Sequence, residues 1–76
     1  MAMSAEFTVE PFTDGKPGPH VQAAIEAAVD AGGSVEVGPF GTKVSGSDEV
    51  VLTAVDSLLR AAMSAGANRV TLQLSR

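Results

Sequence analysis

The centre of this chain reads Val35-Glu36-Val37-Gly38-Pro39-Phe40-Gly41-Thr42-Lys43-Val44. Apolar and polar residues alternate on both sides of a turn that is rich in glycine and contains a proline. Because successive side chains of a strand point to opposite faces, this pattern predicts a β-hairpin with one apolar and one polar face. The hairpin lies between two segments with helical periodicity, and this position restricts the fold.

Two amphipathic helices are predicted, one on each side of the hairpin. The first spans about residues 20–31 and ends at Gly32-Gly33, and the second begins near Ser47 and Asp48 and ends at Gly66. Apolar residues recur three and four positions apart in both helices, so each helix presents one stripe to a common core. These residues are Val21, Ala24, Ile25, Ala28 and Val29 in the first helix and Val51, Leu52, Val55, Leu58, Leu59, Ala62 and Met63 in the second.

Two further alternating runs complete the pattern, at residues 5–12 before the first helix and at residues 69–75 after the second. The order strand, helix, strand, strand, helix, strand predicts one α+β domain over residues 1–76. We expect a ferredoxin-like βαββαβ sandwich whose four-stranded antiparallel sheet has the order 4-1-3-2, with both helices on one face. The uncovered face is predicted to carry Glu6, Thr8, Glu10, Glu36, Lys43, Ser45, Arg69, Thr71 and Gln73.

Composition argues against several classes of protein. Nine acidic residues against five basic ones give a net charge of −4, and no cluster of Lys or Arg occurs, so we expect no nucleic-acid partner. No segment is apolar enough to span a membrane and no signal-peptide pattern is present, so we expect a cytoplasmic protein without a membrane partner. Because so small a domain buries only about 60% of its unfolded surface, it gains stability by associating with itself.

Catalytic and metal-binding groups are sparse. The chain has no cysteine and one histidine, which supplies too few ligands for a metal site, and no nucleophile has an obvious base beside it. The sequence lacks the Cys-x-x-Cys loop of metal-transfer domains, the exposed aromatics of RNA-recognition domains and the arginine-bearing phosphate loop of acylphosphatases. We therefore predict a protein that is not an enzyme and has no metal or cofactor.

Three carboxylates lie on the polar face of the predicted sheet. Glu6, Glu10 and Glu36 can hold an organic cation there. The alternative is that they pair with Lys43 and Arg69 or face water. The sequence leaves both interpretations open.

The turn of the hairpin is more elaborate than the two-residue loops that most hairpins use. Phe40 can stack on a planar ligand or insert into a neighbouring subunit, and Thr42 offers a hydroxyl beside it. His20, at the start of the first helix, can form a hydrogen bond to a ligand or contribute to local packing. We include all three in the candidate site.

Several segments of the chain carry a resemblance to a known family: Ala5-Glu6-Phe7-Thr8-Val9-Glu10-Pro11-Phe12, Pro19-His20-Val21, Val35 to Thr42, and Asn68-Arg69-Val70 leading to Arg76. Over nearly the whole chain they resemble the YkoF-like thiamine-binding protein family. The Gly-Pro-Phe-Gly-Thr hairpin is the strongest part of this resemblance. It implies a ferredoxin-like domain that forms dimers or tetramers and binds thiamine, or a related pyrimidine such as hydroxymethylpyrimidine, without transforming it.

The chemistry of thiamine matches groups on this chain. Its thiazolium cation requires a carboxylate or an aromatic face, its aminopyrimidine requires coplanar donors and acceptors, and its hydroxyethyl group requires one polar partner. The candidate ligand-binding residues are Glu6, Thr8, Glu10, His20, Glu36, Phe40 and Thr42. The alternative function is a structural or regulatory interaction module that oligomerises through its sheet and binds no small ligand. An exposed apolar patch around Phe12 and Phe40 would favour that alternative.

Overall fold

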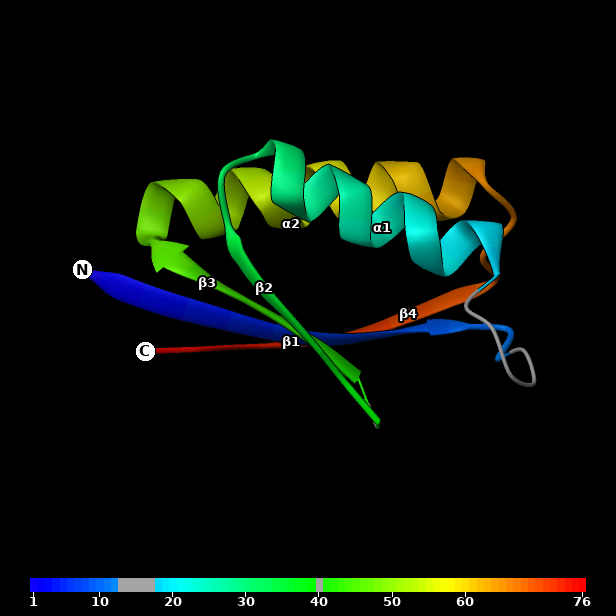
Figure 1. Ribbon diagram of the computed structural model, residues 1–76, viewed down its shortest axis with the longest axis horizontal. Helices are drawn as coiled ribbons and strands as arrows, with labels where there is room; N and C mark the ends of the chain where they lie inside the picture. Colours follow the sequence, from blue (N-terminus) through cyan, green and yellow to red (C-terminus); the bar gives the residue numbers. More distant parts are fainter. Residues whose placement is uncertain (13–17, 40) are drawn as a thin grey trace.

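The computed structural model describes residues 1–12, 18–39 and 41–76. Its elements follow the predicted order and are β1 (Ala2–Glu10), α1 (Pro19–Asp30), β2 (Ser34–Gly38), β3 (Gly41–Ser47), α2 (Asp48–Ser64) and β4 (Arg69–Ser75). The strands form a four-stranded antiparallel sheet in the order β2-β3-β1-β4 (Figure 1). This is the predicted order 4-1-3-2 read from the other edge, so the ferredoxin-like fold is confirmed.

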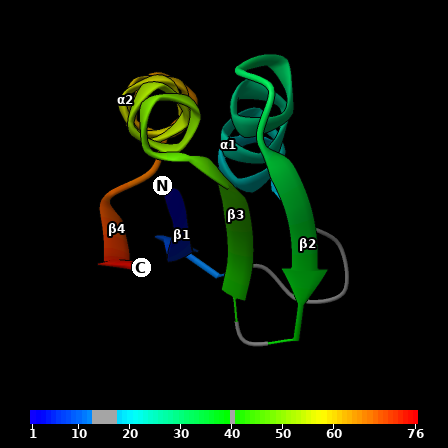
Figure 2. The same cartoon turned by 90° about the vertical axis from the view of Figure 1, so that its left-hand side faces the viewer.

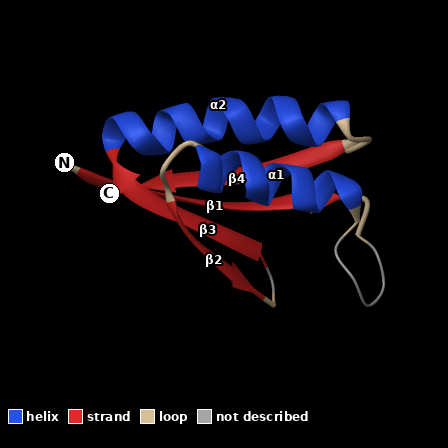
Figure 3. Ribbon diagram, turned by 45° about the horizontal axis from the view of Figure 1, so that its top comes forward, coloured by secondary structure: helices blue, strands red, loops and turns tan. Residues whose placement is uncertain are grey.

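Both helices lie side by side on one face of the sheet (Figure 2). Alternation along β1 sends Ala5, Phe7 and Val9 into the core beneath the helices. The residues between them point to the opposite side, which we call the open face because no described helix covers it (Figure 3). From β1 and its two neighbours, the open face carries Ser4, Glu6, Thr8, Glu10, Lys43, Ser45, Arg69, Thr71, Gln73 and Ser75.

Small side chains dominate the core. Leu58, Val44 and Val51 are the largest fully buried residues, and the other fully buried positions are alanines. Both helices bury alanines, such as Ala24 and Ala28 in α1 and Ala54 in α2, and side chains this small permit close packing of helices. The connection after α1 is equally tight, because a Cβ atom at Gly33 would lie 2.3 Å from Cγ2 of Val44.

The ends of the elements agree closely with the predictions except in β1. This strand begins at Ala2, three residues before the predicted start, where Ala2, Met3 and Ser4 pair with the end of β3. The prediction that the first strand continues to Phe12 is wrong, because Pro11 has no N–H group to extend the ladder. Phe12 is consequently 72% exposed. At the predicted start of α2, the Oγ of Ser47 accepts a hydrogen bond from the Val50 N–H group at 3.2 Å, and Gly66 follows the helix with a φ of +108°.

An ion pair connects β4 to the start of α2. The Nη2 atom of Arg76 donates to Oδ2 of Asp48 at 2.6 Å. This hydrogen bond, together with the positive charge of Arg76, lowers the pKa of Asp48 below its ordinary value of 3.8.

The buried valine of β3 should contribute far more stability than its exposed counterpart in β2. Val44 is fully buried whereas Val37, on the same side of the sheet, is 64% exposed. We expect Val44→Ala to lower the free energy of unfolding by about 2 kcal/mol, because it removes buried methyl groups and leaves a cavity. Val37→Ala, the matched control, should cost less than about 0.5 kcal/mol in urea unfolding. Equal losses would contradict the assigned core.

Replacing Arg76 by Gln should raise the pKa of Asp48 back toward 3.8, as measured by NMR titration of the side-chain carboxyl. Because the pKa in the folded protein is lowered, the pair stabilises the fold above pH 3.8 and stops doing so as the pH falls through that lowered pKa. The stability difference between the native protein and Arg76→Gln should therefore disappear in acid. Arg60→Gln removes a different pair, with Asp56, and should leave the titration of Asp48 unchanged.

Candidate functional site

The strand register places a row of charged and polar residues across the open face. Lys43 in β3 is directly opposite Glu6 in β1 and Glu36 in β2, and Glu6 is also opposite Gln73 in β4. One ammonium group therefore lies in register between two carboxylates. Within the described residues no ion pair of 4.0 Å or less connects Lys43 to either of them.

A second group of residues beside this row has smaller side chains. Thr8 in β1 is directly opposite Thr71 in β4. Gly41 in β3 lies next to Thr8, because a Cβ atom at Gly41 would lie 3.4 Å from Cγ2 of Thr8 and 3.1 Å from the carbonyl oxygen of Phe7. Because Gly41 has no side chain, β1 and β3 can approach each other closely here. The open face has a depression at this point for the same reason.

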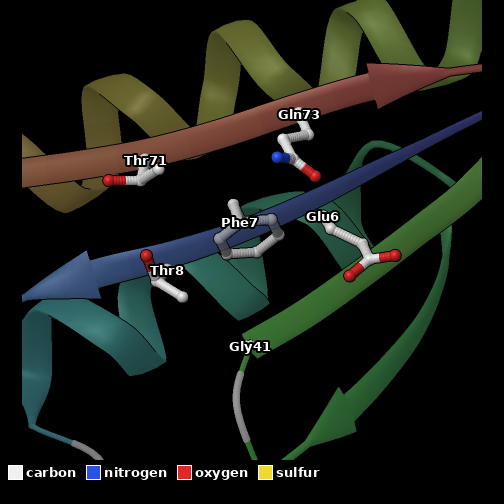
Figure 4. A pocket seen from close by; sticks show the side chains of 6 residues that line it. All are labelled: Glu6, Phe7, Thr8, Gly41, Thr71 and Gln73. Carbon is white, nitrogen blue, oxygen red and sulfur yellow. The ribbon is translucent and has the colours of Figure 1, made fainter.

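Two adjacent hollows result from this arrangement. The β4-side hollow has a volume of about 180 Å³ and is lined by Glu6, Phe7, Thr8, Gly41, Thr71 and Gln73 (Figure 4). The hairpin-side hollow has a volume of about 280 Å³ and is lined by Glu6, Glu36, Val37, Gly38, Pro39, Gly41, Thr42 and Lys43. Glu6 and Gly41 line both hollows. Each hollow alone lies below the roughly 300 Å³ at which ligand pockets typically begin.

The structure brings four of the predicted site residues to these hollows. Glu6 borders both, Thr8 lines the β4-side hollow, and Glu36 and Thr42 line the hairpin-side hollow. Thr42 nevertheless belongs to the helix-covered side of the sheet, where it pairs with Phe7 and is 6% exposed. Its hydroxyl group is therefore much less accessible than the carboxylates beside it.

Two other predicted site residues, Glu10 and His20, do not line either hollow. The Oε2 atom of Glu10 lies 4.0 Å from the Nε atom of Arg69. This ion pair agrees with the alternative interpretation, in which the carboxylate pairs with an arginine of the sheet. His20 is buried, and its Nε2 donates a hydrogen bond to the carbonyl oxygen of Pro11 at 2.5 Å, which connects α1 to the end of β1. Phe40 lies outside the described residues.

Sequence reasoning omitted several residues that line the hollows. The alternation along β4 assigns Thr71 and Gln73 to the correct face, but no sequence pattern marks them as site residues. Only the pairing of β4 with β1 places them beside Thr8 and Glu6. The sequence indicates a turn at Gly41, whereas its position beside both hollows depends on tertiary pairing.

The open face offers several kinds of polar group to a ligand. The hollows combine carboxylates, an ammonium group, hydroxyls and an amide, which together offer both donors and acceptors. Among the described residues no three His, Asp or Glu side chains cluster in a way that could hold a metal ion. None of the helices in the described part of the chain is long and apolar enough to cross a membrane.

Comparisons with solved structures agree with the fold. The hypothetical protein MJ1052 from Methanocaldococcus jannascii is 23% identical with a TM-score of 0.71, over 97% of this chain and 76% of that one. A domain of unknown function from Bacillus cereus is 26% identical with a TM-score of 0.58, over 97% and 72%. A "putative thiamine biosynthesis/salvage protein" from Thermotoga maritima is also 26% identical with a TM-score of 0.58, over 99% and 81%.

A family model identifies the chain more specifically than the solved structures do. No curated protein matches this chain. Residues 5–75, however, match the model of a family that is described as "Thiamine-binding protein". The matched range runs from β1 to β4 and includes every residue that lines the two hollows. The chain therefore belongs to the thiamine-binding protein family.

Proposed function

We propose that this protein is a cytoplasmic, non-enzymatic binding protein for thiamine or a related pyrimidine such as hydroxymethylpyrimidine, and that it acts as a homo-oligomer. The observation that carries this proposal is the position of Glu6, whose carboxylate borders two adjacent hollows on the open face. Membership of the thiamine-binding protein family supports the class of ligand. The description of the Thermotoga maritima relative as a protein of thiamine biosynthesis or salvage agrees with it.

The two hollows suit a ligand with two linked rings. Since each is smaller than a typical ligand pocket, thiamine would occupy both, with the link between its rings above Glu6 and Gly41. The thiazolium cation lies against the carboxylate of Glu6 in this arrangement. The hydroxyls of Thr8 and Thr71 and the amide of Gln73 supply donors and acceptors for the aminopyrimidine.

Lys43 sets a limit on the affinity for a cation. Because it lies in register between Glu6 and Glu36, a bound thiazolium must share these carboxylates with an ammonium group of the protein. Interactions between exposed charges weaken over a Debye length of about 8 Å at physiological ionic strength. Thiamine binding should consequently depend on salt, whereas binding of the uncharged hydroxymethylpyrimidine should depend on it much less.

Neutralising Glu6 should weaken the binding of thiamine selectively. We expect Glu6→Gln to reduce the affinity for thiamine about tenfold or more, because a charge-assisted contact is worth about 1.5–3 kcal/mol. Hydroxymethylpyrimidine should lose less affinity. The measurement is titration calorimetry with each ligand separately, and Glu26→Gln, an equal change of charge at an exposed position on α1, serves as the control.

Two results of this experiment would contradict the proposal. Unchanged thiamine affinity in Glu6→Gln would exclude the assigned site. An absence of heat with thiamine, its phosphates and hydroxymethylpyrimidine, from native protein shown to be folded, would instead favour the interaction module without a small ligand.

The hydrogen bond of His20 assigns this residue to the fold and not to the proposed site. We expect His20→Leu to lower the free energy of unfolding by about 1–3 kcal/mol, because the carbonyl of Pro11 loses its donor. Affinity for thiamine should stay within twofold of the native value. Gln22→Leu, at an exposed position of the same helix, should change neither quantity. Loss of affinity without loss of stability would instead place His20 at the ligand.

A further inference from the structure

Glu36 is a carboxylate of the open face for which the proposed contacts of thiamine give no partner. It lies in β2, the edge strand on the hairpin side, and is directly opposite Lys43, which is in turn opposite Glu6. Residues directly opposite each other across strands point to the same face of a sheet, so these three charges form one row. Because neighbouring strands lie about 4.8 Å apart, the backbone of Glu36 is two strand spacings, or about 10 Å, from that of Glu6.

This row contains one ammonium group for two carboxylates. Lys43 is the single basic residue among the described residues that line the hairpin-side hollow, whereas Glu6 and Glu36 both line it. Arg69, a further basic residue of the open face, lies within 4.0 Å of Glu10 and lines neither hollow. The hairpin-side hollow therefore has a net negative charge.

The position of Glu6 determines which end of thiamine reaches Glu36. The Glu6 side chain extends from β1 toward β3 (Figure 4), so a thiazolium ring against its carboxylate lies on the hairpin side, with the aminopyrimidine in the β4-side hollow. The hydroxyethyl group of thiamine is attached to the thiazolium ring on the side away from the link to the pyrimidine. It is therefore directed along the row toward β2 and Glu36.

We propose that Glu36 is a specificity-determining residue, which accepts a hydrogen bond from the free hydroxyl of thiamine and rejects phosphorylated forms of the ligand. The hydroxyl has one hydrogen to donate, and an ionised carboxylate can only accept. Esterification with phosphate removes this hydrogen and adds a charge of about −1.5 to −2 at pH 7 beside Glu36. The inference deepens the proposed function and rests on it.

Charge balance separates the two forms of the ligand. A bound thiazolium makes the row of Glu6, Lys43 and Glu36 neutral, because it adds the missing positive charge. In thiamine monophosphate the phosphate outweighs the charge of the thiazolium, so the row with its ligand stays negative. Since the phosphate would adjoin Glu36, well within the Debye length of about 8 Å, salt screens this repulsion only in part.

The open face also lacks a common means of holding a phosphate. Phosphate sites often use the N-terminus of a helix, where free N–H groups and the helix dipole attract an anion. Both described helices lie on the opposite face of the sheet, so their N-termini do not face this hollow (Figure 2). Lys43 is already shared by two carboxylates in register. The hollow therefore favours the alcohol over its phosphate ester.

Titration calorimetry with three ligands tests this inference. The ligands are thiamine, its O-acetyl ester, which lacks the hydroxyl hydrogen but adds no charge, and thiamine monophosphate. We expect the native protein to bind them in this order of decreasing affinity. The gap between the two esters should be about tenfold or more, because the monophosphate places like charges side by side.

Replacing Glu36 by Gln should remove most of this gap between the two esters, since a neutral amide does not repel the phosphate. Circular dichroism should remain native, because Glu36 is exposed. Glu26→Gln, an equal change of charge at an exposed position on α1, should keep the gap of the native protein. A purely structural role of Glu36 would change the affinity for both esters alike. A gap that narrows equally in both variants would contradict the assignment to Glu36.

The outcomes distinguish this inference from the proposed function. Native protein that binds thiamine, but binds the monophosphate at least as tightly as the acetyl ester, would overturn the inference and leave the proposed function intact. An unchanged gap in Glu36→Gln would likewise overturn it. Folded native protein that binds none of the three ligands and no hydroxymethylpyrimidine would contradict the proposed function as well.

Discussion

The antiparallel pairing of β1 with β3 on one side and β4 on the other is the constraint on which the rest of the structure depends. Along this central strand, Ala5, Phe7 and Val9 enter the core while the residues between them face away from the helices. A shift of one residue in either pairing would exchange these two sets, so the core and the open face are determined by the same register. The site is therefore a direct product of how the core is packed.

The small size of the core residues affects the site as well. Alanines allow the helices to lie close together, and Gly33 and Gly41 allow close approaches to Val44 and to β1. A core of this kind buries little apolar area per residue, and the stability of so small a domain is correspondingly limited. Leu52, Leu59 and Met63 of α2 lie outside this core and are 50%, 36% and 54% exposed.

The fold could be predicted from the sequence because each of its elements has a regular pattern and the hairpin fixes their order. The open face could be predicted for the same reason, since alternation alone assigns Glu6, Thr8 and Glu36 to it. Alternation does not show which residues are neighbours across strands. Consequently no pattern in the sequence favours Thr71 and Gln73 over Glu10, whose partner is Arg69.

Local chemistry also limited the prediction at the end of β1. The alternating pattern continues through Phe12, but the missing N–H group of Pro11 ends the strand first. His20 bonds to a backbone carbonyl, and no sequence pattern indicates such a partner. Side chains of this type can be assigned to the fold or to a ligand only when the neighbouring backbone is known.

The pairing of the central strand with β4 has a consequence for folding kinetics. The hydroxyls of Ser4 and Ser75 lie 3.2 Å apart although 71 positions separate them in the chain. The hairpin of β2 and β3 closes a short loop and forms at a small entropic cost, whereas β1 must find β4 across almost the entire sequence. Contacts of this kind slow folding relative to helical bundles of similar size. Until β4 docks, one side of β1 remains an unpaired edge, and an unpaired strand edge can pair with other chains.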